Sequence, residues 1–255
     1  MPLFRANGQL CLFAHVPKCA GQSVEAHLRA RFGPLALIDD KFHALRPLHR
    51  PMRCSPQHLT VEHLGRIVPL EWIEHSFAVV RHPIGRFVSA YNYVVANSDN
   101  ISAGMGPEEW FERSLKLAKY EPFHNDNHLR PADELVPEGA AVFRLEDGLE
   151  QVGVYLDETF GPSDAASGFG HRNVSDKETT EIREGDRLSE AFAARLFDYY
   201  GRDFERFGYS QALPDRLKLL KPAAGRGRAH RRGLSDYLPP RMKWAARMAL
   251  ARVMQ

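Results

Sequence analysis

Apolar and polar positions alternate along the chain with a period that changes several times. The run LCLFAHV at residues 10–16 is bounded by glycine and proline, which is typical of a short buried strand. In residues 22–32 the apolar positions instead recur at helical spacing, and Gly33 followed by Pro34 ends this pattern. The first part of the chain therefore predicts a strand that leads directly into a helix.

The same strand-to-helix pattern occurs twice more. The run SFAVV at residues 76–80 predicts a second buried strand, followed by a helix from Pro83 to about Ala96. The run AAVFRLE at residues 140–146 predicts a third strand, and the segment after it again has apolar positions on one helical face. Strands that alternate with helices are typical of a largely parallel central sheet, so we expect an α/β protein.

The end of the chain differs in composition from the rest. A last helix with inward-facing aromatic residues is predicted over residues 188–206, and loops are predicted at 46–58 and 161–178. Beyond it, the stretch KPAAGRGRAHRRG is typical of a linker. We therefore expect one α/β domain over residues 1–220 and a basic C-terminal tail over residues 221–255.

Charge is spread unevenly between these two parts. The whole chain has a net charge of +2, but residues 221–255 contain nine Lys or Arg and one Asp, so the tail carries +8 and the body −6. An anion site in the body must therefore be built locally. The final stretch RMKWAARMALARVMQ is compatible with an amphipathic helix on a membrane surface or with a terminal helix packed on its own domain.

Cysteine usage and apolar segments bear on the compartment. Cys11, Cys19 and Cys54 form an odd, sparse set without paired spacing, which argues for a reducing environment. No secretory signal or membrane-spanning segment is recognisable. We expect a cytoplasmic protein, with peripheral contact to the inner face of the membrane through the tail as an alternative. Nucleic acid is not an expected partner, and the sequence indicates no oligomeric state.

A candidate anion site lies where the first strand leads into its helix. The stretch PKCAGQS combines a mobile cation in Lys18, a glycine that allows close backbone approach in Gly21, and a hydroxyl donor in Ser23. In an open parallel sheet, ligands bind beyond the carboxyl ends of strands, where helix N-termini attract anions. The lysine precedes the glycine, whereas in the common nucleotide loop it follows. The alternative is a strand-to-helix turn with a surface lysine and a capping serine.

A second candidate anion site follows the second strand. The stretch FAVVRHPIGRFVSAY places Arg81 at the strand end, on the same edge of a parallel sheet as Lys18. Arg86 and Ser89 are three residues apart, so they can share a helix face, and an arginine with a hydroxyl can clamp a phosphate. The alternative is a structural ion pair for Arg81 and a packing role for Ser89. Two such loops predict a ligand with two separated anionic groups.

These two stretches resemble the paired signature of sulfotransferases that use 3′-phosphoadenosine 5′-phosphosulfate (PAPS), closest to the carbohydrate branch with its Golgi-type and bacterial members. In that family the motifs commonly read HIPKTGGTS and VRDPxxRxxSxY, and a weaker resemblance extends over about residues 10–210. The departures are Cys19, Ala20, Gln22 and His82. The resemblance implies a three-layer, P-loop NTPase-like fold and sulfuryl transfer to an acceptor hydroxyl, which leaves adenosine 3′,5′-bisphosphate (PAP).

The resemblance also implies roles for individual residues. Arg81 and Ser89 are expected to hold the 3′-phosphate, and Arg172, in the late polar loop, resembles the segment that closes over the nucleotide. Lys18 is expected to offset the charge that develops on the leaving phosphate. The 5′-phosphosulfate is expected to lie against the loop residues Lys18, Cys19, Ala20, Gly21, Gln22 and Ser23.

Transfer to a hydroxyl requires a general base near neutral pH, and histidine is the usual choice. His58, between the two motifs, resembles the position at which carbohydrate sulfotransferases place a base. Glu62, four residues later, could orient His58 or replace it, and His63 is also near. His128, in the stretch NHLRP, is the second candidate. Because the chain has twelve histidines, each of these also has a structural alternative.

We expect no metal. His124 and His128 are four residues apart, but the sequence offers no third ligand of known position. The acceptor implied by the resemblance is a sugar hydroxyl on a glycan or glycolipid, with small alcohols and peptide tyrosine as alternatives. One competing function is a P-loop-like kinase or NTPase, which normally has the opposite lysine order and an acidic strand end for magnesium. The other is a non-catalytic nucleotide- or membrane-binding protein that works through its tail.

Overall fold

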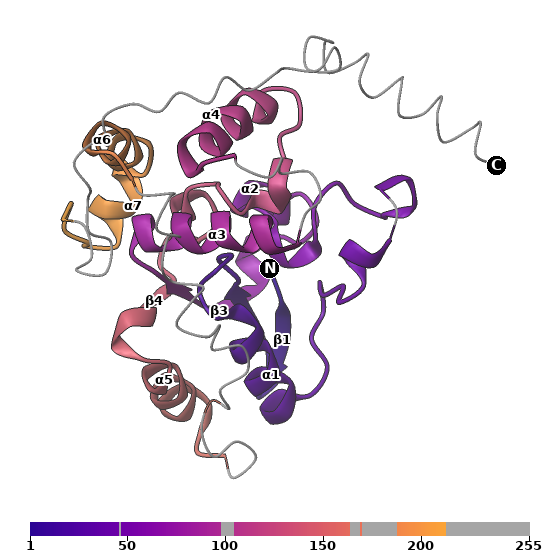
Figure 1. The fold of residues 1–255 in the computed structure, drawn as a ribbon. Coiled ribbons are helices and arrows are strands. Elements are labelled where there is room, and N and C mark those ends of the chain that lie inside the picture. Colours follow the sequence, from indigo (N-terminus) through magenta and orange to yellow (C-terminus); the bar gives the residue numbers. More distant parts are fainter. Residues whose placement is uncertain (46, 98–104, 164–168, 170–187, 213–255) are drawn as a thin grey trace. The chain divides into compact units, whose positions relative to one another are not determined.

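The structure, a computed structural model, describes residues 1–45, 47–97, 105–163, 169 and 188–212 (Figure 1). The chain divides into two units, Met1–Lys221 and Pro222–Gln255. The second unit lies outside the described residues, so the amphipathic tail helix stays a prediction.

A four-stranded sheet in the order β1-β2-β3-β4 forms the centre of the first unit. β2 pairs in parallel with β3, and β3 in parallel with β4, whereas β1 is an antiparallel edge strand next to β2. The three predicted strands and the mainly parallel sheet are therefore confirmed. The strands are β1 (Leu3–Ala6), β2 (Gln9–Ala14), β3 (Ile73–Val80) and β4 (Ala141–Arg144).

The edge strand β1 is the part of the sheet that the sequence analysis missed. Asn7 and Gly8, between β1 and β2, have φ angles of 50° and 85°, which is the left-handed backbone that a two-residue hairpin turn requires. Asn-Gly between two apolar runs is a strong sequence signal for such a hairpin. The antiparallel strand could therefore have been predicted from the stretch LFRANGQLCLFA.

Helices cover both faces of the sheet. Figure 1 shows α1 (Gly21–Phe32) and α5 (Glu150–Phe160) on one face, and α2 (Val61–Gly65) and α3 (Pro83–Asn97) on the other. This arrangement confirms the predicted three-layer α/β architecture. The helices that pack beyond α3 are α4 (Pro107–Ala118), α6 (Glu190–Tyr199) and α7 (Gly201–Arg206).

Two features of these outer helices differ from the sequence analysis. The single helix predicted over residues 188–206 is two helices, because the backbone leaves the helical conformation at Tyr200 (φ −98°, ψ 19°). The buried Tyr200 hydroxyl donates to the Leu129 carbonyl at 2.9 Å, which holds this break in place. α4 was not predicted, although Gly106 followed by Pro107 is a typical helix start.

Short 3₁₀ helices lie in the connections, including the predicted loop at 46–58. Two of them, η3 and η5, carry candidate site residues. The bounds are η1 (Phe42–Ala44), η2 (Pro47–His49), η3 (Pro56–His58), η4 (Leu70–Trp72), η5 (His124–Asn127), η6 (Ala132–Glu134) and η7 (Leu145–Asp147).

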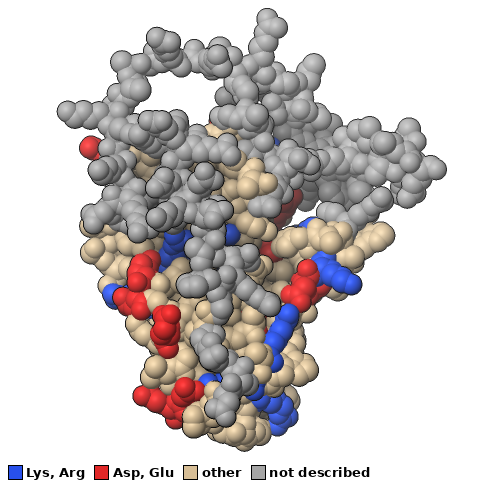
Figure 2. All heavy atoms as spheres, turned by 60° about the horizontal axis from the view of Figure 1, so that its bottom comes forward, with Lys and Arg blue, Asp and Glu red and all other residues tan. Residues whose placement is uncertain are grey.

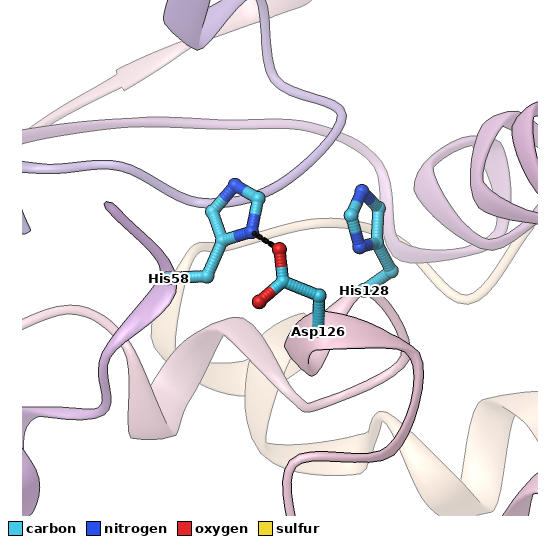
Figure 3. Close-up of side chains that lie close together, drawn as sticks. All are labelled: His58, Asp126 and His128. Atoms are coloured by element: carbon cyan, nitrogen blue, oxygen red, sulfur yellow. Dashed lines mark hydrogen bonds and ion pairs between the residues drawn. The ribbon is translucent and has the colours of Figure 1, made fainter. Parts of the chain in front are cut away.

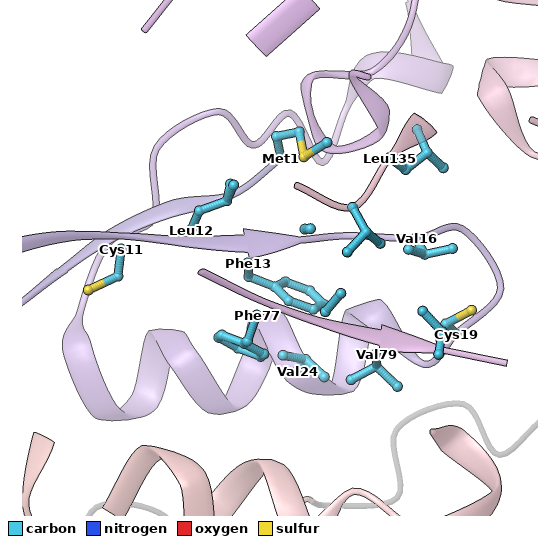
Figure 4. Packing of buried hydrophobic residues seen from close by; sticks show 14 of the residues in the cluster. Met1, Cys11, Leu12, Phe13, Val16, Cys19, Val24, Phe77, Val79 and Leu135 are labelled. Atoms are coloured by element: carbon cyan, nitrogen blue, oxygen red, sulfur yellow. The ribbon is translucent and has the colours of Figure 1, made fainter. Parts of the chain in front are cut away.

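The main apolar core packs against the sheet (Figure 4). Phe13 of β2 stacks on Phe77 of β3 with ring centroids 5.1 Å apart, and Val24 of α1 lies beneath them. Full burial of such a side chain stabilises the fold by about 1.5–3 kcal/mol. The core therefore fixes the end of β2 and the start of α1, where the first candidate anion site lies.

A second core holds α3 against the outer helices. Phe87 of α3 packs against Trp110 and Phe111 of α4 and Phe192 of α6, with ring centroids 5.6–5.8 Å apart. This packing fixes α3, the helix that carries Ser89.

The described surface is mixed in charge. On the face shown in Figure 2, Lys and Arg of the described residues lie among Asp and Glu rather than in one broad basic patch. Among the described helices, none combines the length and the apolarity that crossing a bilayer requires.

Candidate functional site

The two predicted anion loops lie at the same edge of the sheet. β2 and β3 are parallel and in register up to Ala14 and Ala78, so the segments that follow both strands leave the sheet side by side. Lys18 and Arg81 are close enough for their charges to repel. Burial, assisted by the charge of Arg81, lowers the pKa of Lys18 to about 8. An anion between these two side chains would offset their repulsion and would favour the charged form of Lys18.

The first loop, residues 18–23, is called here the donor loop. Lys18 and Ala20 have left-handed backbone, with φ angles of 69° and 60°. Ala20 is the N-cap of α1 and makes no side-chain capping hydrogen bond, and the first turn of α1 has no acidic residue. Ser23 lies inside the first turn, where its N–H donates to the Ala20 carbonyl at 3.0 Å, so it is not the capping residue. The positive end of α1 is therefore unopposed by a carboxylate of its own first turn.

Gly21 is required by packing within the protein. A Cβ atom at this position would lie 1.9 Å from Nε2 of His15, far closer than atoms can approach. Nδ1 of His15 is 2.6 Å from the Glu25 carboxylate. Burial nevertheless lowers the pKa of His15 to about 4, so the ring is neutral near pH 7. The His15 ring thus packs directly against Gly21 of the donor loop.

Other donor-loop side chains have more limited roles. Cys19 is buried, and burial raises its pKa to about 12, so the thiol stays protonated. Gln22 is exposed, and Ala20 is partly exposed. Lys18 is the one side chain of the loop with a cationic group, and its Nζ atom lies 4.1 Å from the centroid of the Tyr93 ring.

The second candidate anion loop, which follows β3, differs from the sequence prediction in the role of Arg86. Arg86 is 1% exposed, and its guanidinium donates to the carbonyls of His128 and Arg130 at 3.2 and 2.7 Å. It is therefore a structural residue rather than part of a phosphate clamp. Arg81 and Ser89 are both partly exposed, so they stay available as the predicted contacts for a phosphate.

A carboxylate reaches this loop from η7, the 3₁₀ helix that follows β4. His82 occupies the position at which an acid is usual, but its backbone N–H donates to Glu146 Oε1 at 2.8 Å. The Tyr209 hydroxyl donates to the other oxygen of Glu146 at 2.9 Å. The loop after β3 is therefore held by the segment that follows β4.

A cluster of three side chains, His58, Asp126 and His128, forms the second half of the candidate site (Figure 3). His58 ends η3, whereas Asp126 and His128 come from η5 and the residue after it. Nδ1 of His58 lies 2.8 Å from Asp126 Oδ2, and the rings of His58 and His128 meet edge to face at 5.1 Å. These residues are called the histidine cluster below. The structure thus brings together both histidines that the sequence analysis singled out as candidate bases.

Asp126 is the site residue that the sequence analysis missed. Its carboxylate accepts hydrogen bonds from the N–H and the hydroxyl of Ser55 at 2.7 and 2.8 Å, and from His43 at 2.9 Å, besides His58. Burial alone would raise the pKa of Asp126, but the hydrogen bonds from His43 and His58 outweigh burial and hold it well below its usual range. Asp126 is therefore an ionised carboxylate that orients His58.

The backbone around Asp126 is unusual. Asn125, Asp126 and Asn127 are three consecutive residues with left-handed φ angles of 54°, 52° and 61°. Such residues cost free energy, on the order of 1 kcal/mol or more each, and tend to gather at functional sites. The turn is held by hydrogen bonds from Asn125 to Ser114 at 3.0 Å and from Asn127 to the His58 carbonyl at 2.7 Å. The run of Asn and Asp residues in FHNDNH was the sequence signal for this turn.

The hydrogen bonds also determine which ring nitrogens are basic. His58 Nδ1 faces a carboxylate, and His128 Nδ1 faces the Asn125 carbonyl at 2.8 Å. Because both partners only accept hydrogen bonds, Nδ1 carries the proton in the neutral form of each ring, and Nε2 then keeps the lone pair. Burial lowers the pKa of His128 to about 3, so this ring is neutral near pH 7.

The histidine cluster could also be considered for a metal. One ligand atom from each of its three residues lies within 4.8 Å of the others. The Asp126 carboxylate, however, already accepts four hydrogen bonds, and both Nδ1 atoms are engaged. This arrangement suits proton transfer better than metal coordination. His124, the other histidine of the stretch, pairs with Glu121 at 3.3 Å and lies outside the cluster.

The remaining predicted site residues lie elsewhere. Glu62 is exposed and pairs with Arg66, so the structure gives the orienting contact expected of Glu62 to Asp126 instead. His63 Nδ1 lies 2.5 Å from the Thr60 hydroxyl. Arg172 lies outside the described residues, and its predicted role is not addressed by the structure.

A comparison with known families identifies the class of protein that this fold and site define. The model of the sulfotransferase family matches residues 2–210, which is most of the chain and contains the donor loop and the histidine cluster. The chain therefore belongs to the sulfotransferase family and is a transferase, and its helix-flanked sheet is the P-loop-like fold of that family. No curated protein and no solved structure matches the chain.

Proposed function

We propose that the protein transfers the sulfuryl group of PAPS to a hydroxyl of an acceptor, with a sugar on a glycan or glycolipid as the preferred acceptor. Membership in the family supports sulfuryl transfer in general. The choice of PAPS as donor rests on the two cations, Lys18 and Arg81, at one edge of the sheet. Two separated cationic points fit the two anionic groups of this nucleotide.

The single observation that carries this proposal is the contact between the donor loop and the histidine cluster. The Lys18 ammonium lies 4.1 Å from the centroid of the Tyr93 ring, and that ring stacks on His128 with centroids 5.3 Å apart. A cation for the leaving phosphate and the histidine cluster that contains the proposed base are thus separated by one aromatic ring. In-line transfer between two oxygens requires this proximity.

The proposed step uses groups that the structure holds ready. His58 accepts the proton of the acceptor hydroxyl at Nε2, and Asp126 stabilises the imidazolium that forms. The acceptor oxygen forms a bond to sulfur while the bond between sulfur and the 5′-phosphate oxygen breaks. Lys18 and the N-terminus of α1 offset the charge that develops on the departing phosphate. The products are a sulfate ester and PAP, and His58 then releases its proton to solvent.

His128 is the second candidate for the base. Its Nε2 atom keeps a lone pair, but its own Nδ1 is bonded to a backbone carbonyl rather than to a carboxylate. A neutral partner stabilises an imidazolium less than an ionised one does. We therefore assign proton transfer to His58 and acceptor positioning to His128.

The tail supports a separate proposal on location. Residues 221–255 carry a net charge of +8, and we propose that they hold a cytoplasmic enzyme at anionic membranes. Sedimentation with phosphatidylserine vesicles tests this, with a variant truncated after residue 220 as the control. Equal sedimentation of both proteins would exclude the tail as the membrane contact.

Transfer of radiolabelled sulfate from PAPS to an array of glycans and glycolipids tests the function. We expect label on a subset of sugar acceptors, and no label with the Lys18→Ala variant. Transfer only to small alcohols or to peptide tyrosine would overturn the acceptor class while leaving sulfuryl transfer intact. Absence of PAP binding by folded protein would overturn the proposal as a whole.

A further inference from the structure

Tyr93 joins the two halves of the candidate site, and the sequence motifs give it no role. It lies on α3 four residues after Ser89, so both side chains face the same side of that helix. Its ring contacts the Lys18 ammonium at 4.1 Å and stacks on His128 with an interplanar angle of 7°. Tyr93 is 40% exposed, so it is not needed to fill the apolar core.

The contact with Tyr93 bears on the charge of Lys18. Burial and the charge of Arg81 both disfavour the charged form of Lys18. Among the described residues, His128 is a further titratable side chain that faces this pair, and it is neutral near pH 7. The face of an aromatic ring attracts an ammonium group, so the ring of Tyr93 opposes the effects of burial and of Arg81.

The stacking on His128 adds a geometric effect. His128 meets His58 edge to face at 5.1 Å, so the orientation of the Tyr93 ring is transmitted to the ring next to the proposed base. An aromatic side chain at this point therefore constrains the cation on the donor side and the imidazole pair on the acceptor side together. Misplacement by about 1 Å at such a point can reduce turnover by roughly 10²-fold.

We propose that Tyr93 is a positioning residue that holds the Lys18 ammonium beside the His58–His128 pair through its aromatic face. This inference rests on the proposed sulfuryl transfer. It requires the ring and not the hydroxyl, so phenylalanine is predicted to replace tyrosine and an aliphatic side chain is not.

The test compares Tyr93→Phe with Tyr93→Leu, with Tyr120→Leu as the control at another exposed tyrosine, which is 69% exposed. The titration of Lys18 is followed by NMR of protein with ¹³C-labelled lysine, with Lys18→Arg to assign the signal. In Tyr93→Leu the pKa of Lys18 is expected to fall by about half a unit, because the ring no longer favours the charged form. Tyr93→Phe and Tyr120→Leu are expected to titrate like the wild type.

Steady-state kinetics of the same variants give the second readout. Tyr93→Leu is expected to lower kcat roughly tenfold, while the melting temperature changes little. Tyr93→Phe is expected to retain turnover within about twofold. An unchanged Lys18 titration in Tyr93→Leu would overturn the proposal, as would a loss in Tyr93→Phe equal to that in Tyr93→Leu. The titration needs no substrate, so it tests Tyr93 even if the wild type fails to bind PAP and the proposed function is thereby shown to be wrong.

Discussion

The donor loop consists of six consecutive residues, three that precede α1 and three in its first turn, whereas the histidine cluster takes His58 and Asp126 from segments 68 residues apart in sequence. The donor loop is held by the sheet, the apolar core and the ring of His15. The histidine cluster lies on 3₁₀ turns and is held by hydrogen bonds to side chains and carbonyls. The proposed anion-binding part is thus local and packed against the core, while the proposed proton-transferring part depends on a polar network.

This difference indicates which half can vary between related enzymes. The proposed donor is a single nucleotide, and a loop built into the sheet suits it. The proposed acceptor contacts lie on irregular turns, which can change without disturbing the sheet. We therefore expect acceptor specificity to be determined by the segments around His58 and His128.

The largest expected effect comes from the histidine cluster. His58→Ala should lower kcat by on the order of 10²- to 10⁴-fold while PAP binding stays nearly intact, because only proton transfer is lost. Steady-state kinetics with saturating donor measure this. His128→Ala is the matched comparison, and its effect should fall mainly on the acceptor KM. If His128→Ala abolishes turnover while His58→Ala stays active, the two assignments must be exchanged.

The donor loop should respond differently to loss of each cation. Lys18→Ala should lower kcat by on the order of 10²-fold, because its charge acts mainly as the leaving phosphate develops. Arg81→Ala should chiefly weaken donor binding, by roughly 10- to 100-fold, since the 3′-phosphate does not change during transfer. Kinetics with varied PAPS separate the two effects. A raised donor KM with unchanged kcat in both variants would make Lys18 a binding residue only.

Acid should destabilise both regions through buried neutral histidines. The folded-state pKa values of His15 and His128, about 4 and about 3, lie below the unfolded value near 6.5. The unfolded chain therefore binds more protons below pH 6.5, so the free energy of unfolding is fully present above that pH and decreases as pH falls. At pH 5.5 the loss is about 1.4 kcal/mol for each histidine.

Urea unfolding at pH 7.5 and 5.5 measures this loss. The His15→Gln variant removes one of the two titrating groups, so its stability should decrease less between these pH values than that of the wild type. An equal decrease in both proteins would show that His15 is not buried as a neutral ring beneath the donor loop.

The smallest effect is expected at the N-cap of α1. Ala20 has a left-handed φ of 60°, at a position where the family commonly has glycine. Ala20→Gly should raise the free energy of unfolding by up to about 1 kcal/mol, because glycine adopts this backbone without strain. Chemical unfolding measures the change, with Ala30→Gly on the exposed face of α1 as a control that should destabilise. Destabilisation by Ala20→Gly would contradict the left-handed cap.

The two regions also differ in how well the sequence predicts them. The donor loop could be read from PKCAGQS, because its residues are consecutive and its position follows from the strand and helix on either side. Asp126 could not, because its partners His43, Ser55 and His58 come together only through the tertiary fold. Glu62 was expected near His58 on sequence spacing alone. In the structure Glu62 lies on the short helix α2, and its side chain pairs with Arg66 instead.

The same reasoning explains the outcome for the fold. The parallel strands β2, β3 and β4 were predicted because each is an apolar run that leads into a helix. β1 was missed because the strand has only four residues, although the Asn-Gly turn that follows it indicates a hairpin. Arg86 was expected at the site, yet the sequence does not show that its guanidinium is enclosed by Asp203 of α7 and by the carbonyls of His128 and Arg130.

The central claim is that the donor loop and the segment after β3 form one site for a nucleotide with two anionic groups. Calorimetric titration with PAP tests this claim most directly. We predict saturable binding of one PAP per chain, at least tenfold weaker in Arg81→Ala and unchanged in Arg66→Ala, a control cation that pairs with Glu62. ATP, which lacks the 3′-phosphate, should bind more weakly than PAP. Folded protein that shows no heat with PAP, or that binds PAP equally well without Arg81, would contradict the account.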